Sequence, residues 1–84
     1  MATPKQTVTL TAEQIAELNL QLATMRHDIN NNISVIVAAL ELIRFQPEVA
    51  ERMLTSIAQQ PRKITDALGK FSAEFEKHLG ITRQ

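Results

Sequence analysis

Apolar residues recur at alternating spacings of three and four along two long stretches of the chain. The first set, which skips only the position of Asn32, comprises Ile15, Leu18, Leu22, Met25, Ile29, Ile36, Ala39 and Ile43. The second set comprises Ala50, Leu54, Ile57, Pro61, Ile64, Leu68, Phe71, Phe75 and Leu79. This spacing keeps apolar side chains on one face of an α-helix. The pattern therefore predicts an all-α chain with two long amphipathic helices.

Local signals place the ends of these helices. The segment "TAEQ" puts Gln14 three residues after Thr11, which is a capping box and predicts that the first helix begins there. The segment "FQPE" predicts that this helix ends at about Arg44, because Pro47 disfavours helical geometry at Gln46 and suits the first turn of a following helix. The two helices are therefore expected to form an antiparallel hairpin.

The second helix is expected to end at Gly80, a residue typical of a helix C-cap. Residues 1–10 are then a flexible N-terminal arm, residues 11–80 a helical-hairpin domain and residues 81–84 a C-terminal tail. A single hairpin leaves half of each apolar stripe in water, and pairing with a second copy would bury it. We therefore expect a homodimer that forms a four-helix bundle. The sequence leaves open a monomer that belongs to a larger assembly.

Composition narrows the class of protein. The chain has 84 residues with no Cys, Trp or Tyr, and its nine basic and nine acidic residues cancel. This balance argues against a nucleic-acid or anionic-membrane partner, which requires clustered Lys and Arg. The longest apolar stretch, "ISVIVAALELI", is interrupted by polar residues and is much shorter than the roughly 20 residues of a membrane span. The first residues lack the pattern of a secretory signal, so a cytoplasmic protein is expected.

A polar block, "RHDINNN", interrupts the apolar pattern of the first helix. If Leu22 and Met25 are the a and d positions of a heptad, His27 falls at f and Asn31 at c, both on the outer side of the helix. Asp28 lies on the flank beside them. A histidine on the outer face of a helix is more often solvated than functional. The neighbouring Asp and Asn are what favour a chemical role here.

The sequence "HDINNNI" followed by "SVIVAALELI" resembles the H-box of the dimerisation and histidine phosphotransfer domain of two-component sensor histidine kinases. In that family a His is followed by an acid, two variable residues, an Asn or Thr, and an apolar residue. The second-helix sequence "RKITDALGKFS" is similar to the helix that follows the H-box. The resemblance covers about residues 12–79. It implies that His27 is the phosphoacceptor, that Asp28 orients it, and that Asn31 assists hydrolysis of a phosphorylated partner.

The resemblance also implies partners and a function. The expected function is a histidine-containing phosphotransfer protein that exchanges phosphate with an aspartate of a response regulator receiver domain, or receives it from a histidine kinase. No intrinsic cofactor is expected, and Mg²⁺ would belong to the regulator. Neither a metal site nor a hydrolase arrangement is expected, because His27 and Asp28 point apart and His78 is distant.

The chain departs from the family in two ways. Asn32 stands where many of these kinases have Pro, and we interpret Asn30 and Asn32 as solvated helix residues. Gly69 and Gly80 are the only glycines, so the glycine-rich nucleotide motifs of a kinase are absent and this chain is not expected to be an autonomous ATP-dependent kinase. Two alternatives stay open. One is a catalytically inactive dimeric binding module, and the other is a phosphatase or inhibitor of a kinase or regulator.

The hairpin predicts which residues of the second helix border the polar block. With the turn near Gln46, equal counts outward place Thr65 level with His27 and Pro61 level with Asn31. Pro61 is expected to bend the second helix there. Charged residues near this level would meet a docking partner, although such a run is usually only a solvated face. The expected partner-binding residues are Arg26, Arg62, Lys63 and Asp66.

Overall fold

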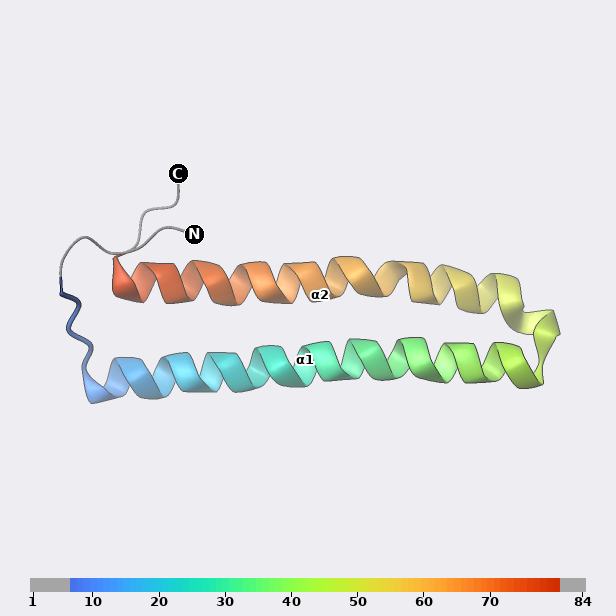
Figure 1. The fold of residues 1–84 in the computed structure, drawn as a ribbon, viewed down its shortest axis with the longest axis horizontal. Coiled ribbons are helices and arrows are strands. Elements are labelled where there is room, and N and C mark those ends of the chain that lie inside the picture. The colour runs from blue at the N-terminus through green and yellow to red at the C-terminus, as the bar shows by residue number, and fades with distance from the viewer. Residues whose placement is uncertain (1–6, 81–84) are drawn as a thin grey trace.

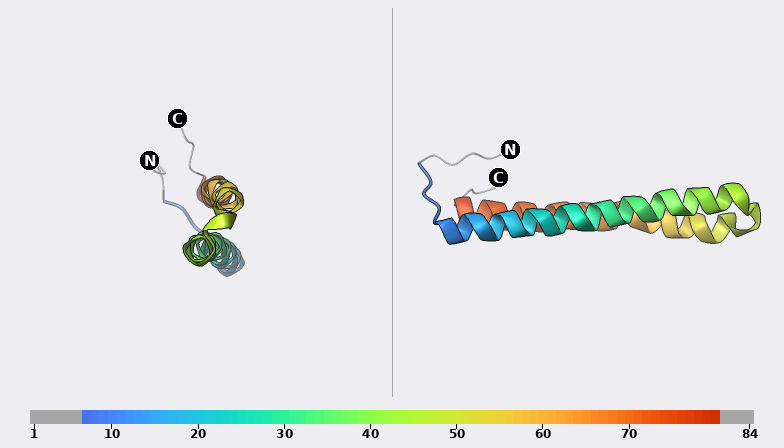
Figure 2. Two further views of the ribbon diagram at one scale, coloured as in Figure 1. Left: turned by 90° about the vertical axis from the view of Figure 1, so that its right-hand side faces the viewer. Right: turned by 90° about the horizontal axis from the view of Figure 1, so that it is seen from below.

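The computed structural model describes residues 7–80 and consists of two long antiparallel helices joined by a tight turn (Figure 1). Helix α1 spans Ala12–Phe45, a short 3-10 helix η1 spans Pro47–Val49, and helix α2 spans Ala50–Leu79. The molecule is 57 Å along its longest axis and 12 Å along its shortest. The two helices lie side by side in one layer and cross at a shallow angle (Figures 1 and 2). The predicted all-α hairpin is confirmed.

The start of α1 is fixed by the predicted capping box. The Thr11 hydroxyl oxygen accepts a hydrogen bond from the Gln14 backbone N–H at 3.1 Å, and the Gln14 side-chain oxygen accepts one from the Thr11 N–H at 2.9 Å. The Ile15 N–H donates to the Thr11 carbonyl at 3.0 Å and begins the helical ladder. Two N–H groups that would otherwise lack a partner are thus satisfied by side chains.

The turn between the helices is short and hydrogen-bonded. The Gln46 N–H donates to the Leu42 carbonyl at 2.8 Å and closes α1, and the Val49 N–H donates to the Gln46 carbonyl at 3.0 Å within η1. Pro47 occupies the first position of η1, where its missing N–H costs nothing. The α-helix proper starts one 3-10 turn later than Pro47, at Ala50.

At its far end, α2 stops at Gly80, as predicted. Gly80 adopts a left-handed conformation with φ of 65°, and its N–H donates to the Lys77 carbonyl at 3.4 Å. A side chain would strain this conformation, so Gly is the favoured residue. The predicted C-terminal tail, residues 81–84, lies outside the described residues, as do residues 1–6 of the predicted arm. Residues 7–10 precede α1 without helical structure.

Helix α2 continues through Pro61 without a break. Pro61 itself is exposed, and its carbonyl accepts a hydrogen bond from the Thr65 hydroxyl at 2.9 Å. Because Pro has no N–H, the carbonyl of Ile57 loses its ordinary helical donor. The proline therefore weakens the backbone ladder locally but does not end the helix.

The hairpin has almost no core of its own. Only four of the described residues are buried, namely Leu18, Asn32, Ala39 and Gln60. Asn32 was expected to be solvated, and that interpretation is wrong. It fills the gap in the three-and-four pattern of α1, so it points at α2 as its apolar neighbours in the pattern do. No large apolar side chain among the described residues is fully buried.

Six of the nine exposed large apolar side chains in the described part of the chain lie on one side of the hairpin, and Leu20, Leu42 and Phe45 are exposed elsewhere. Successive residues of an α-helix turn by about 100°. Leu40 is rotated about the α1 axis relative to the buried Asn32. Leu68 is rotated about the α2 axis relative to the buried Gln60, and the sense of rotation is the same. In two antiparallel helices that face each other, rotation in the same sense leads to the same side of the pair. We call this the apolar side, defined by the exposed residues Ile15, Ile33, Val37, Leu40, Leu54 and Leu68.

The polar block of α1 faces the side of the hairpin opposite to the apolar side. His27 and Asn31 are rotated about the α1 axis from Asn32 in the opposite sense to Leu40. Both His27 and Asn31 are exposed. On α2, Gln59, Lys63 and Asp66 turn to this same side. We call it the polar side, defined by His27, Asp28, Asn31, Gln59, Lys63 and Asp66. The hairpin therefore presents its apolar surface and its polar block in different directions.

The capping box predicts a measurable contribution to stability. Thr11→Ala removes the hydroxyl acceptor for the Gln14 N–H and should lower the free energy of unfolding by about 1 kcal/mol. Chemical denaturation followed by circular dichroism measures this change. Thr9→Ala, outside the helix and exposed, is the matched control and should change stability little. Equal effects of the two substitutions would contradict a capping role for Thr11.

Candidate functional site

His27 lies in the first half of α1 and projects into solvent. Its side chain is 84% exposed, and that of the neighbouring Asp28 is 56% exposed. This placement agrees with the outer heptad position predicted for His27. An exposed imidazole on a rigid helix can be approached by a second protein without any rearrangement of the hairpin.

Asp28 lies beside one ring nitrogen of His27. The distance from His27 Nδ1 to Asp28 Oδ1 is 3.6 Å, which is an electrostatic contact slightly longer than a hydrogen bond. A carboxylate at Nδ1 favours the tautomer that carries its proton there, and this leaves the lone pair on Nε2. Because both groups are exposed, the contact contributes little to stability. Its effect is on the orientation and tautomer of the ring.

Asn31 follows His27 by one helical turn and is exposed on the polar side. Its neighbour Asn30 is also exposed, as expected, but lies farther around α1 from the contact with α2. The Asn30 carbonyl accepts a hydrogen bond from the Ser34 hydroxyl at 2.9 Å. Asn31 is therefore the amide that is better placed to act together with His27 and with groups on α2.

The four charged residues expected to bind a partner are all exposed, but they do not form one cluster. Lys63 and Asp66 face the polar side near the level of His27. Arg62 points outward from α2, and Arg26 turns toward the edge of the apolar side, because it precedes His27 by one residue. No ion pair within residues 7–80 joins Lys63 or Asp66 to His27. The residues that share the side of His27 are thus Lys63 and Asp66.

Two buried amides near the site were not recognised as a pair from the sequence. Gln60 is 3% exposed and Asn32 is 8% exposed. A usable signal was present, since the inward positions of α2 run Met53, Ile57, Gln60 and Ile64 at spacings of four, three and four. The predicted stripe instead used Pro61, which is exposed.

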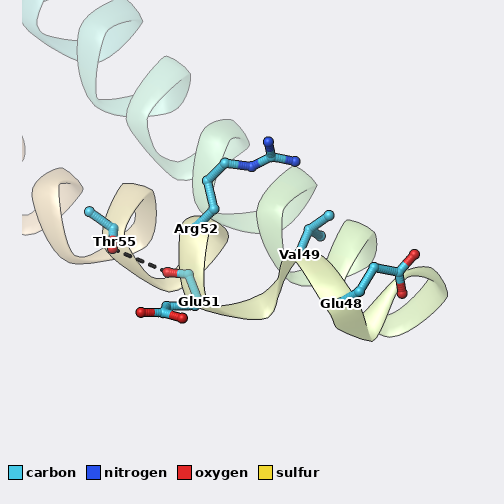
Figure 3. A pocket seen from close by; sticks show the side chains of 5 residues that line it. All are labelled: Glu48, Val49, Glu51, Arg52 and Thr55. Carbon is cyan, nitrogen blue, oxygen red and sulfur yellow. Dashed lines mark hydrogen bonds between the residues drawn. The ribbon is translucent and has the colours of Figure 1, made fainter.

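Elsewhere the described part of the chain offers no competing site. No group of three or more His, Cys, Asp and Glu side chains among residues 7–80 could hold a metal ion. A shallow, open depression beside the turn is lined by Glu48, Val49, Glu51, Arg52 and Thr55 (Figure 3). The Thr55 hydroxyl donates to the Glu51 carbonyl at 3.1 Å, and the labelled side chains do not converge on one point. Neither helix has a stretch long and apolar enough to span a bilayer.

Comparison of the chain with protein-family models, with curated proteins and with solved structures finds no match. The likeness to the H-box therefore rests on the residues of this sequence and on their placement along α1.

The exposure of His27 leads to a prediction about stability. His27→Ala should change the free energy of unfolding by no more than about 0.5 kcal/mol, because the side chain makes no packing contact in the helix pair. Leu18→Ala, at a buried position on the same helix, should instead cost about 2 kcal/mol or more. Thermal and chemical unfolding compare the two variants. A loss for His27→Ala as large as that for Leu18→Ala would place the histidine in the core.

Proposed function

We propose that this chain is a cytoplasmic histidine-containing phosphotransfer protein of a two-component system, phosphorylated on His27. The observation that carries the proposal is an exposed histidine with an aspartate at its Nδ1, set in a sequence that resembles an H-box. A phosphoacceptor must be reachable by a partner and must keep one ring nitrogen unprotonated. The position and surroundings of His27 support both requirements.

The proposed transfer runs between His27 and the phosphorylated aspartate of a response regulator. The lone pair of Nε2 attacks phosphorus, the N–P bond forms, and the bond from phosphorus to the aspartate oxygen breaks. The leaving group is the regulator's carboxylate, so no proton has to move. The imidazole ring gains positive charge in this step, and the Asp28 carboxylate near Nδ1 stabilises it. The reverse sequence of bonds returns the phosphoryl group to the regulator.

Asn31 and the regulator supply the other parts of the proposed reaction. The Asn31 amide, one turn from His27, can orient phosphoryl oxygens or a water molecule that attacks the regulator's aspartyl phosphate. Mg²⁺ is expected on the receiver domain, not on this chain. Lys63 and Asp66 share the polar side and would meet the docked partner. A histidine kinase is a second proposed source of phosphate for His27.

We further propose that two copies form a four-helix bundle through their apolar sides. Six large apolar residues are exposed on that side, and no large apolar side chain among the described residues is fully buried. A hairpin with so little buried surface is marginal in water, whereas a shared core of four helices is a stable arrangement. His27 lies on the opposite side of α1, so burial of the apolar side leaves it accessible.

The proposed function predicts a specific effect of His27 and Asn31 substitutions. A panel of radiolabelled, phosphorylated receiver domains should transfer acid-labile phosphate to the wild-type chain. His27→Gln should abolish this labelling, because Gln has no nucleophilic ring nitrogen. His78→Gln makes the same chemical change at the other histidine and should keep the labelling.

Asn31 is tested in the same assay. Asn31→Ala should retain labelling but slow the loss of phosphate from the regulator, and Asn30→Ala, the neighbouring amide, should not slow it. Labelling that survives His27→Gln would refute His27 as the acceptor. A partner bound equally well by all these variants, with no phosphate ever found on the chain, would favour the binding module.

The proposed dimer is tested at Leu68. Leu68→Glu places a charge in the shared core and should raise the dimer dissociation constant by roughly 100-fold, or about 2.8 kcal/mol. Sedimentation or light scattering over a concentration series measures the dissociation constant. Gln59→Glu adds the same charge to the polar side of α2 and should leave it unchanged. A wild-type chain that is a stably folded monomer at high concentration would end the bundle proposal.

A further inference from the structure

The least exposed residue of the described part of the hairpin is polar. Gln60, at 3% exposed, is the least exposed of the four buried residues, and Asn32 is a second amide among them. Apolar or small residues occupy the neighbouring inward positions, with Ile29 and Ile36 flanking Asn32 on α1. A helix of this length could have continued the apolar pattern here. Two buried amides in one otherwise apolar contact line therefore require a physical account.

Asn32 and Gln60 lie at the same level of the hairpin. Asn32 precedes Gln46 in the turn by 14 residues, and Gln60 follows Gln46 by 14. Helix α1 is continuous from Asn32 to Phe45, and α2 is continuous from Ala50 to Gln60 after the single turn of η1, so equal counts give roughly equal distances from Gln46. Both residues are inward positions of the three-and-four spacing. The two amides therefore form one layer of the contact between α1 and α2.

The hydrogen-bond inventory of this layer is incomplete. Gln60 Nε2 donates to the Ser56 carbonyl at 3.1 Å, but Gln60 Oε1 is buried and accepts no hydrogen bond within residues 7–80. Pro61 follows directly and offers no N–H to the Ile57 carbonyl. Gln60 Oε1 is thus a buried acceptor without a donor among the described residues, and the Ile57 carbonyl beside it loses its ordinary helical donor. The side-chain amide of Asn32 has two N–H groups, and it is the inward-facing donor of α1 at that level.

In this structure no hydrogen bond joins the two amides. We propose that rotation of their side chains pairs them across the hairpin, with Asn32 Nδ2 donating to Gln60 Oε1, and that this pair positions the His27 turn of α1 against α2. The positioning role rests on the proposed function, and the pairing itself does not. An apolar layer tolerates sliding of one helix along the other, because any apolar neighbour is acceptable. A buried amide pair does not, since a shift leaves both amides unpaired against apolar side chains.

The amide pair lies in the contact between α1 and α2, and each of these helices contributes part of the polar side. His27 precedes Asn32 by five residues on α1, and Lys63 follows Gln60 by three on α2. The axial position of Asn32 relative to Gln60 therefore sets where His27 stands relative to Lys63. Asn32 and Gln60 touch neither phosphate nor partner in this account. They are positioning residues that act through the helix pairing.

A double-mutant cycle tests the pairing without any partner protein. Asn32→Leu or Gln60→Leu alone strands one buried amide and should lower Tm by about 4–8 °C. The double variant Asn32→Leu with Gln60→Leu removes both amides and should melt at or above the wild-type Tm. Melting is measured by circular dichroism at fixed protein concentration, with dimerisation checked for each variant. Strictly additive losses in the double variant would overturn the pairing.

Phosphate transfer to His27 from a labelled receiver domain tests the positioning. The stable double-Leu variant should accept phosphate roughly 10-fold more slowly than the wild type, because the site has lost its fixed register. The swapped variant Asn32→Gln with Gln60→Asn keeps one amide on each helix and should recover most of the rate. A double-Leu variant that is labelled at the wild-type rate would overturn the positioning role and leave a purely structural layer.

The two experiments separate failure of this inference from failure of the proposed function. If the wild-type chain accepts no phosphate, the proposed function fails and the positioning role falls with it. The melting cycle still decides whether the amides pair. If labelling of His27 succeeds and the swapped variant is no faster than the double-Leu variant, phosphotransfer stands and the amide pair does not position the site.

Discussion

Everything in this molecule depends on one line of contact between two antiparallel helices. The three-and-four spacing places one inward residue on each helix at every turn, and the short turn at Gln46 sets which of them meet. The direction that faces the other helix then determines where every remaining side chain points. His27 is exposed because it is turned away from that line, and Leu40 is exposed because it is turned away in the other sense.

The fold could be predicted from the sequence because its signals are local. Thr11 and Gln14 form the capping box within four residues, Pro47 restricts the residue before it, and Gly80 suits a left-handed cap. Each signal needs no knowledge of distant contacts. The helix boundaries therefore agreed with expectation to within a few residues. The largest difference is at the start of α2, because Pro47 opened a 3-10 turn before the α-helix.

The buried amides could not be recognised in the same way. Burial of Asn32 depends on which of several helix faces meets α2, and polarity argues against burial unless the period of the pattern is trusted over the residue type. Gln60 presents the same difficulty beside Pro61, because both positions continue a three-and-four spacing. Only the packing of α1 on α2 decides between them. The exposure of His27 was easier to predict, since an outer heptad position stays exposed in either arrangement.

In the proposed function, the separation of the two sides links assembly to chemistry. A site for transient transfer must stay open to a partner, whereas a bundle must close over its apolar residues, and one helix cannot offer the same face to both. In α1 the residues Ile33 and Leu40 turn one way and His27 and Asn31 turn the other, with Asn32 between them against α2. A change at the contact line therefore rotates or shifts both surfaces together. Under the proposed amide pairing, this coupling makes the polarity of a single buried layer relevant to a histidine that the layer does not touch.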